Sequence, residues 1–220
     1  MKIIVDAFGG DNAPLEIIKG TMLAVDEYGI DAVLVGDIEK INSCVNENNI
    51  SLKNTEVVNA GGVIDMCDDA KSVLKEKADS SMAVGFKLLN EGRGDAFVSA
   101  GNTGAITVGA TFITKRIKGI KRPAIASVMP SADKPFLLMD CGANSECRAE
   151  HLYQFGLMGN LYMKNIMKVK NPRVALANNG SEETKGTPTV REAFELMKKA
   201  PYNFIGNIEA GKFLLVMRMS

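Results

Sequence analysis

The sequence is short of histidine, of long apolar runs and of any excess charge. Its 220 residues include 26 Lys and Arg, 26 Asp and Glu and one histidine, for a formal net charge of +0. A balanced chain argues against a protein whose main task is to bind nucleic acid, because that binding depends on an excess of cations. The longest apolar runs, such as residues 213–217, are only a few residues long, whereas a bilayer-spanning helix needs roughly 20. The chain also reaches Asp6, Gly9 and Gly10 too early for a secretory signal, so we expect a cytoplasmic protein.

Cysteine and histidine are too scattered for a zinc site. Cys44, Cys67, Cys141 and Cys147 show no CxxC spacing, and His151 is the only histidine. Reduced, buried thiols are the expected state, and the sequence predicts neither a metal nor a cofactor. Catalysis must then depend on lysine, carboxylates, hydroxyls, amides or backbone dipoles, unless His151, which we expect on a helix surface, takes part.

Short apolar segments alternate with segments of helical periodicity along the chain. Strands are expected over residues 3–5, 32–36, 56–59, 96–99, 125–128, 136–139, 174–177 and 203–205, with helices in most of the intervals. This alternation indicates βαβ crossovers, and so an α/β fold with a mainly parallel sheet. We expect one α/β domain over residues 1–210 and an atypical tail at 211–220. The region after Gly119 is a candidate second lobe on the same sheet.

Polar and glycine-rich turns follow four of the expected strands. Ligands bind beyond the carboxyl ends of parallel strands, so we expect these turns to converge on one edge of the sheet. The candidate residues are Asp6, Gly9, Gly10 and Asp11 after the first strand; Ser99, Gly101, Asn102, Thr103 and Gly104 after the fourth; Asp140, Gly142 and Asn144 after the sixth; and Asn179, Gly180, Glu182, Lys185 and Gly186 after the seventh. Asp6 and Asp140 either orient a lysine, bind a metal or cap a turn.

The turn from Ser99 to Gly104 has the composition of an anion-binding loop. A strand that ends in Ser, Gly, Asn, Thr and Gly and enters a helix leaves backbone N–H groups free at the positive end of the helix dipole. Such a turn suits phosphate; the alternative is a plain helix cap with glycines for tight packing. The turn matches neither GxxxxGK[ST] nor GxGxxG, so ATP hydrolysis and ordinary dinucleotide binding lose support.

Lysine and arginine residues supply two further candidates. Lys185 lies in a polar loop, where it either neutralises a phosphate or a developing oxyanion or remains a solvated surface lysine. Glu182 and Glu183 are either its ion partners or simple surface charges. A basic stretch without any acid is either a solvated helix end or a docking patch for an acidic partner, and its cations are Lys115, Arg116, Lys118, Lys121 and Arg122.

These motifs, taken together, resemble a known family. The matching segments run in the same order from Met1 to about Ala210, and they are residues 5–14, 98–105, 119–124, 140–144, 154–159, 171–176, 179–186 and 202–209. They are similar to the bacterial phosphate acyltransferases of the PlsX family. The resemblance implies a fold of the phosphotransacetylase and isocitrate dehydrogenase type.

The resemblance also implies an activity. Members of the family move a fatty acyl group from acyl carrier protein to inorganic phosphate, and the acyl phosphate then feeds a glycerol-3-phosphate acyltransferase in phospholipid synthesis. The family is a cytosolic homodimer that associates peripherally with the membrane. Thioester phosphorolysis needs positioning and electrostatics rather than a covalent nucleophile. Lys185 is then the neutralising group, Asn144 or Asn179 a neutral donor, and Asp6 and Asp140 shape the site.

The chain departs from the family after Ala210. The family continues with a further strand, an Asp-Gly-Phe-Thr-Gly-Asn turn, an apolar helical hairpin and a His-Gly segment, whereas residues 211–220 resemble none of these. We interpret this tail as a truncation or frameshift scar. Two alternatives to the acyltransferase remain: an inactive fragment that retains only phosphate or carrier-protein binding, and a phosphotransacetylase acting on coenzyme A thioesters.

Overall fold

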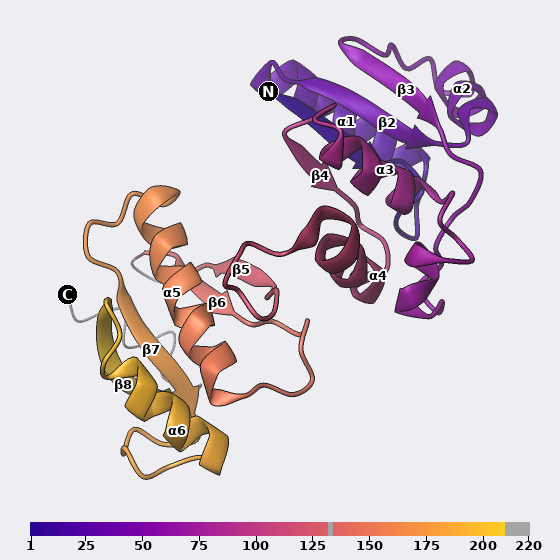
Figure 1. Cartoon of the computed structure of the whole chain (residues 1–220). Helices are drawn as coiled ribbons and strands as arrows, with labels where there is room; N and C mark the ends of the chain where they lie inside the picture. Colours follow the sequence, from indigo (N-terminus) through magenta and orange to yellow (C-terminus); the bar gives the residue numbers. More distant parts are fainter. Residues whose placement is uncertain (132–133, 210–220) are drawn as a thin grey trace. The chain divides into compact units, whose positions relative to one another are not determined.

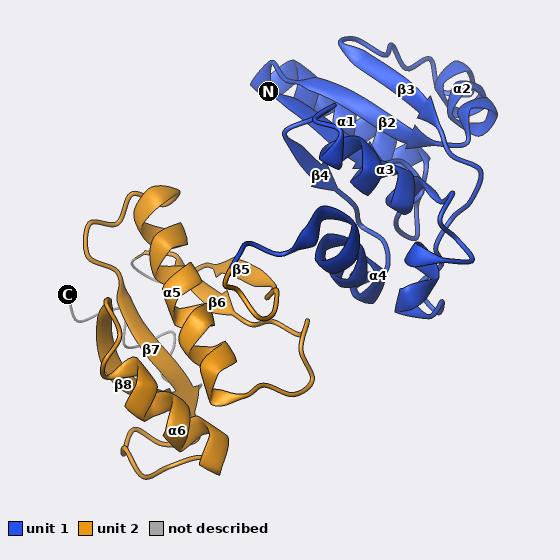
Figure 2. Cartoon of the chain, in the orientation of Figure 1, with its two compact units in different colours: residues 1–118 blue, residues 119–220 orange. Residues whose placement is uncertain are grey.

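The computed structural model describes residues 1–131 and 134–209; the atypical tail at 211–220 lies outside the described residues. The chain divides into two compact units, residues 1–118 and residues 119–220 (Figure 2). Each unit has its own strands and helices, which follow one another in the expected order (Figure 1). The expectation of a single domain over residues 1–210 stays a prediction.

The first unit is built on a parallel sheet of four strands in the order β3-β2-β1-β4. The strands are β1 (Lys2–Asp6), β2 (Asp31–Gly36), β3 (Thr55–Asn59) and β4 (Ala96–Val98). Strand β2 is buried on both faces, because Val33 and Val35 pack with Leu88 while Leu34 packs with Ile18 and Ile41. A strand that is buried on both faces has a nearly continuous run of apolar residues, and such runs predicted this sheet from the sequence.

Helices cover both faces of that sheet, as expected. Ile18 belongs to α1 (Leu15–Tyr28) and Ile41 to α2 (Ile38–Glu47), whereas Leu88 belongs to α3 (Ser81–Asn90) on the opposite face. A short 3₁₀ helix, η1 (Ala70–Leu74), lies between β3 and α3. The unit ends with α4 (Thr103–Gly109), which continues as the π-helical η2 (Ala110–Lys115). The mainly parallel α/β architecture is therefore confirmed.

In its described residues, the second unit contains two strand pairs and two helices. Strands β5 (Ala126–Met129) and β6 (Phe136–Met139) pair antiparallel, while β7 (Arg173–Asn178) and β8 (Asn203–Glu209) pair in parallel. The helices are α5 (Ala149–Asn165) and α6 (Pro188–Met197). Ala149, Leu176, Ala193, Phe194 and Met197 form the core.

Within the described ranges the strands form three sheets: the four-stranded sheet of the first unit, and the β5–β6 and β7–β8 pairs of the second unit. The convergence of the four turns on one sheet edge stays a prediction. The antiparallel β5–β6 pair follows from chain length, because residues 130–135 are too few for the crossover that parallel strands require. None of the described helices is long and apolar enough to cross a membrane.

Candidate functional site

The ends of β1 and β4 bring Asp6 and Ser99 together in the first unit. The two strands are parallel neighbours, with Val5 opposite Val98, so the residues that follow them leave the sheet side by side. The Ser99 hydroxyl donates to Asp6 Oδ2 at 2.7 Å and accepts from Gly101 N at 3.1 Å. Asp6 is only 2% exposed, and its other oxygen accepts from Phe8 N at 3.2 Å. A buried carboxylate held in this way shapes both turns.

Glycine is required where the two turns touch. A Cβ atom on Gly9 would lie 2.6 Å from Ser99 Oγ and 2.9 Å from Gly101 N, closer than real Cβ contacts. Gly10 has a φ of 112°, a value that favours glycine over residues with side chains. The glycine-rich sequence after β1 therefore allows close backbone packing against the Ser99–Gly104 turn; Asp11 beyond it is exposed.

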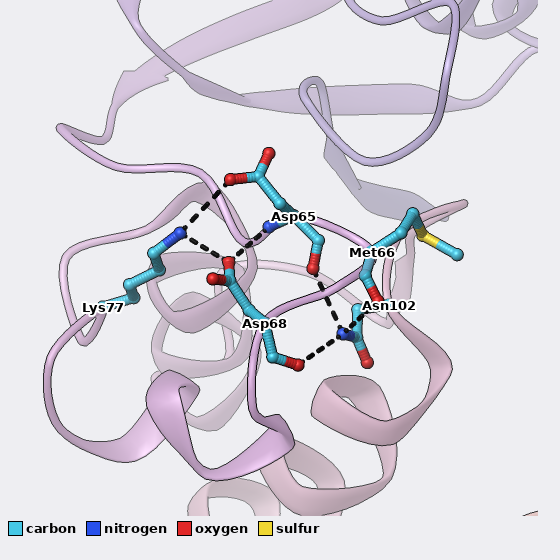
Figure 3. Close-up of polar contacts among 5 residues, drawn as sticks. All are labelled: Asp65, Met66, Asp68, Lys77 and Asn102. Atoms are coloured by element: carbon cyan, nitrogen blue, oxygen red, sulfur yellow. Dashed lines mark hydrogen bonds and ion pairs between the residues drawn. The ribbon is translucent and has the colours of Figure 1, made fainter.

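The side chain of Asn102 caps a helix and also binds a distant loop, so both its oxygen and its nitrogen form hydrogen bonds. Its Oδ1 accepts from Ala105 N at 3.0 Å, which caps α4. Its Nδ2 donates to the carbonyl oxygens of Asp65, Met66 and Asp68 at 3.2, 3.2 and 3.1 Å (Figure 3). The side chains of Ser99 and Asn102 thus stabilise the turn. Thr103 and Gly104 are exposed residues in the first turn of α4, where N–H groups have no partner within the helix and are candidate donors for an anion.

Asp140 organises the corresponding turn of the second unit. Its Oδ1 accepts from Ile125 N at 2.7 Å and Ala143 N at 3.3 Å, and its Oδ2 accepts from Asn144 N at 2.8 Å and Asn144 Nδ2 at 3.0 Å. Partial burial raises the pKa of this carboxyl, but the hydrogen bonds outweigh burial and leave the pKa below its ordinary value.

Asn144 is committed to the same turn. Besides Asp140, its Nδ2 donates to the Pro123 carbonyl at 2.9 Å, and its Oδ1 accepts from Arg122 Nη1 at 3.3 Å. Gly142, with a φ of 112°, allows the chain to bend between Asp140 and Asn144. Asp140 and Asn144 therefore define a rigid turn, and the amide of Asn144 is already in use.

The Lys185 turn is held by two asparagines from neighbouring strands. Asn178, the last residue of β7, donates to the Lys185 carbonyl at 3.1 Å, and Asn207 of β8 donates to the Glu182 carbonyl at 2.8 Å. Lys185 N also donates to the Glu182 carbonyl at 3.1 Å. The Lys185 side chain is exposed, and no ion pair of its ammonium is found among the described residues.

The other candidates in this turn have separate surroundings. Glu183 pairs with Lys198 at 3.1 Å, so it is not the ion partner of Lys185. Gly180 is buried against Glu182, Gly186 has a φ of 90°, and Asn179 is exposed. Asn207, which sequence reasoning missed, is 8% exposed, and its Oδ1 accepts no hydrogen bond from the described residues. A polar residue between Gly206 and Ile208, in the middle of a strand, was the signal that could have found it.

The basic stretch crosses from the first unit into the second. All five of its cations are exposed, and they are Lys115, Arg116, Lys118, Lys121 and Arg122. Two of them have partners in the second unit, because Lys121 forms an ion pair with Glu150 and Arg122 donates to Asn144. An open pocket of about 290 Å³ beside that ion pair is lined by Lys121, Glu150, Tyr153, Gln154 and Leu196, and by none of the strand-end candidates.

The prediction of a surface histidine is wrong. His151 is 7% exposed and, with Ala149 and Phe155, belongs to the buried residues of α5. Its Nδ1 accepts from Arg148 N at 3.2 Å. Burial, with the nearby charge of Arg122, holds the pKa of the ring below its ordinary value, so the ring is neutral and structural. In the described part of the chain, no cluster of His, Cys, Asp and Glu has the arrangement of a metal site.

Comparison with known sequences identifies relatives along nearly the whole chain. A family model described as "Fatty acid synthesis protein" matches residues 1–215. A phosphate acyltransferase of Dictyoglomus turgidum is 46% identical over 211 residues, covering 95% of this chain and 63% of the relative. A phosphate acyltransferase of Acetivibrio thermocellus is 43% identical over 216 residues, covering 98% and 64%. The chain thus spans a little under two thirds of the length of these relatives.

Solved structures agree on the architecture. A phosphotransacetylase from Streptococcus pyogenes superposes with a TM-score of 0.72 at 17% identity, covering 95% of this chain and 68% of that structure. A branched-chain phosphotransacylase from Enterococcus faecalis V583 gives 0.62 at 16% identity, with 96% and 70% covered. At such identities the likeness concerns the fold, and it confirms the expected phosphotransacetylase type. By its match over residues 1–215, the chain belongs to the fatty acid synthesis protein family.

Proposed function

We propose that the protein transfers a fatty acyl group from acyl carrier protein to inorganic phosphate and so forms an acyl phosphate for phospholipid synthesis. The observation that carries the proposal is the match to phosphate acyltransferases at 46% and 43% identity. The Asp6–Ser99 contact supports it, because it holds the glycine-rich turn that enters α4 at the end of a parallel strand.

Phosphate binds, in this proposal, to the Ser99–Gly104 turn. The N–H groups of Thr103 and Gly104 precede the helical hydrogen-bond ladder and are therefore donors for an anion. Gly101 and Asn102 support them from within the turn, and Asp6 keeps Ser99 in place. Gly9 and Gly10 let the neighbouring turn approach closely enough to complete the binding surface.

The reaction is a direct displacement. A phosphate oxygen attacks the thioester carbonyl, the new C–O bond forms, and the carbonyl electrons move onto oxygen as an oxyanion. Collapse of this intermediate breaks the C–S bond and releases the carrier as a thiolate, which takes up the proton that the attacking hydrogen phosphate gives up. Lys185 neutralises the phosphate or the oxyanion, with Asn179 as a neutral donor, while Asp140, Gly142 and Asn144 shape a second turn.

The basic stretch is the proposed docking patch for the acidic carrier protein. Lys115, Arg116 and Lys118 carry this role in the first unit, joined by Lys121 and Arg122 in the second. The family resemblance extends the proposal to a cytoplasmic homodimer, to peripheral association with the membrane and to a downstream glycerol-3-phosphate acyltransferase.

The test is acyl-phosphate production by the purified chain, trapped with hydroxylamine, from acyl-carrier-protein thioester and inorganic phosphate. We expect product from the wild type, a raised phosphate KM in Asn102→Ala and a lowered kcat in Lys185→Ala. If both variants keep the phosphate KM and the kcat of the wild type, the site assignment is overturned. Absence of product from the wild type would indicate a binding-only fragment. Faster turnover of acyl-coenzyme A would instead favour a phosphotransacetylase, the activity named for the structurally similar proteins.

A further inference from the structure

The loop after β3 folds back onto the Ser99–Gly104 turn. Three carbonyl groups of this loop, those of Asp65, Met66 and Asp68, point at the Nδ2 atom of Asn102 (Figure 3). Two amide hydrogens are thus shared among three acceptors that come from a segment more than thirty residues away in sequence. The position of Asn102 depends on the loop staying in this conformation.

The loop is closed by its own hydrogen bonds and by Lys77. Asp68 N donates to the Asp65 carbonyl at 3.1 Å, and Asp68 Oδ2 accepts from Asp65 N at 2.6 Å. The Lys77 ammonium lies 2.5 Å from Asp68 Oδ2 and 3.5 Å from Asp65 Oδ2. The side chains of Lys77 and Asp68 are 30% and 26% exposed, so salt screens this pair less than a fully exposed one.

Both groups of the pair are charged at neutral pH. The hydrogen bond with Asp68 raises the pKa of Lys77, and the hydrogen bond with Lys77 lowers the pKa of Asp68. The carboxylates of Asp65 and Asp68, at the two ends of the loop, both face the ammonium of Lys77 (Figure 3). The attraction between these charges therefore holds the two ends of the loop together.

We propose that Lys77 is a positioning residue for phosphate: through Asp68 it holds the 65–68 loop against Asn102, and Asn102 in turn fixes the amides of Thr103 and Gly104. The inference rests on the proposed function, because it assigns phosphate to that turn. Without Lys77 the loop and the turn become mobile, and phosphate binding must then order them, which lowers affinity. Lys77 itself makes no contact with phosphate.

Two substitutions with opposite charge effects separate positioning from simple electrostatics. Lys77→Met removes a positive charge and Asp68→Asn removes a negative one, so a field effect would weaken phosphate binding in the first and strengthen it in the second. Positioning predicts weaker binding in both. We expect the Kd for inorganic phosphate, measured by isothermal titration, to rise about three- to fivefold in each variant, the range of a partly exposed ion pair.

Matched variants give the controls. Lys75→Met removes a positive charge from an exposed lysine two residues away and should leave the Kd unchanged. Lys77→Arg keeps the charge and should restore most of the affinity lost in Lys77→Met. If Lys77→Met fails to fold by circular dichroism, Asp68→Asn decides alone, since only positioning predicts a weaker complex there.

The outcomes distinguish this inference from the proposed function. If Lys77→Met and Asp68→Asn both bind phosphate with the Kd of the wild type, the positioning role is overturned. Tighter phosphate binding by Asp68→Asn also overturns it. Wild-type protein that binds no phosphate overturns the phosphate turn and the positioning role together. Wild-type protein that binds phosphate but forms no acyl phosphate contradicts the acyltransferase activity while the positioning role is still decided by the Kd values.

Discussion

Ser99 Oγ donates a hydrogen bond of 2.7 Å to Asp6 Oδ2 across the parallel β1–β4 pair. The two residues are 93 positions apart, and this contact joins the turns that follow their strands. Asp6 is almost fully buried, so the hydroxyl is one of the few groups that compensate its removal from water. The contact therefore carries both stability and the shape of the proposed phosphate site.

Ser99→Ala should destabilise the protein by about 1–3 kcal/mol, because it leaves a buried acceptor on Asp6 and the Gly101 amide without their partner. Urea unfolding measures this change. Ser51→Ala, at an exposed serine of the same unit, is the matched control and should have little effect. Equal stability of the two variants would contradict the role assigned to the contact.

Gly9→Ala should destabilise the protein by about 1–3 kcal/mol, the usual cost of overpacking. The added methyl group would lie 2.9 Å from the backbone nitrogen of Gly101. A backbone atom cannot rotate away as a flexible side chain can, so the backbone itself would have to shift. Gly20→Ala is the opposite case, since nothing lies within 4 Å of its Cβ position in α1. That substitution should stabilise the protein by about 0.5–1 kcal/mol. Thermal melts of both variants check the pair, and a stabilised Gly9→Ala would refute the close approach.

Asp140 should make stability depend on pH in the acid range. Its pKa in the folded protein lies below the ordinary value of 3.8, so its carboxylate stabilises the fold above that pH. This contribution is lost as the pH falls through the folded pKa. The melting temperature of Asp140→Asn should accordingly lie below that of the wild type at pH 7, and the gap should narrow below about pH 4. A gap that stays constant from pH 7 to pH 3 would show that the charge of Asp140 is unimportant.

Asn207→Ala should loosen the Lys185 turn, because it removes the donor to the Glu182 carbonyl. The loss of this partly buried hydrogen bond should cost about 1 kcal/mol, and the local loss should appear as faster proteolysis within residues 182–186. Lower kcat for acyl phosphate should accompany it if Lys185 neutralises the oxyanion. Asn171→Ala, at an exposed asparagine near the start of β7, is the control. Unchanged proteolysis in Asn207→Ala would contradict its role in the turn.

Lys118→Glu tests the carrier-protein patch more cleanly than Lys121→Glu, because Lys121 already pairs with Glu150. Reversal of one exposed charge should raise KM for acyl carrier protein several-fold at low ionic strength, with kcat unchanged, and added salt should reduce the difference. Lys170→Glu, at an exposed lysine outside the stretch, should leave KM unaltered. If KM for Lys118→Glu equals that of the wild type at low salt, the patch has no part in docking.

Local structure was largely predictable from the sequence. Helix starts depend on a side chain that reaches an amide two or three residues ahead, and Asp37, Ser80 and Thr187 cap their helices in this way. Apolar runs such as residues 32–35 marked the buried strands, and the four-stranded parallel sheet followed from their alternation with helices. The family resemblance came from the same turns.

The partners of the polar side chains were decided by the tertiary structure. A plain helix cap was one of two alternatives for the Ser99–Gly104 turn, and Asn102 does cap α4. Only the fold brings the 65–68 loop, which pairs with Lys77, into contact with the side-chain amide nitrogen of Asn102. His151 looked like a surface residue until the packing of its helix buried it. A helix cap involves residues only two or three positions apart, so the local sequence is enough to predict it. A contact such as Asp6 with Ser99 depends on strand order and register, which periodicity does not encode.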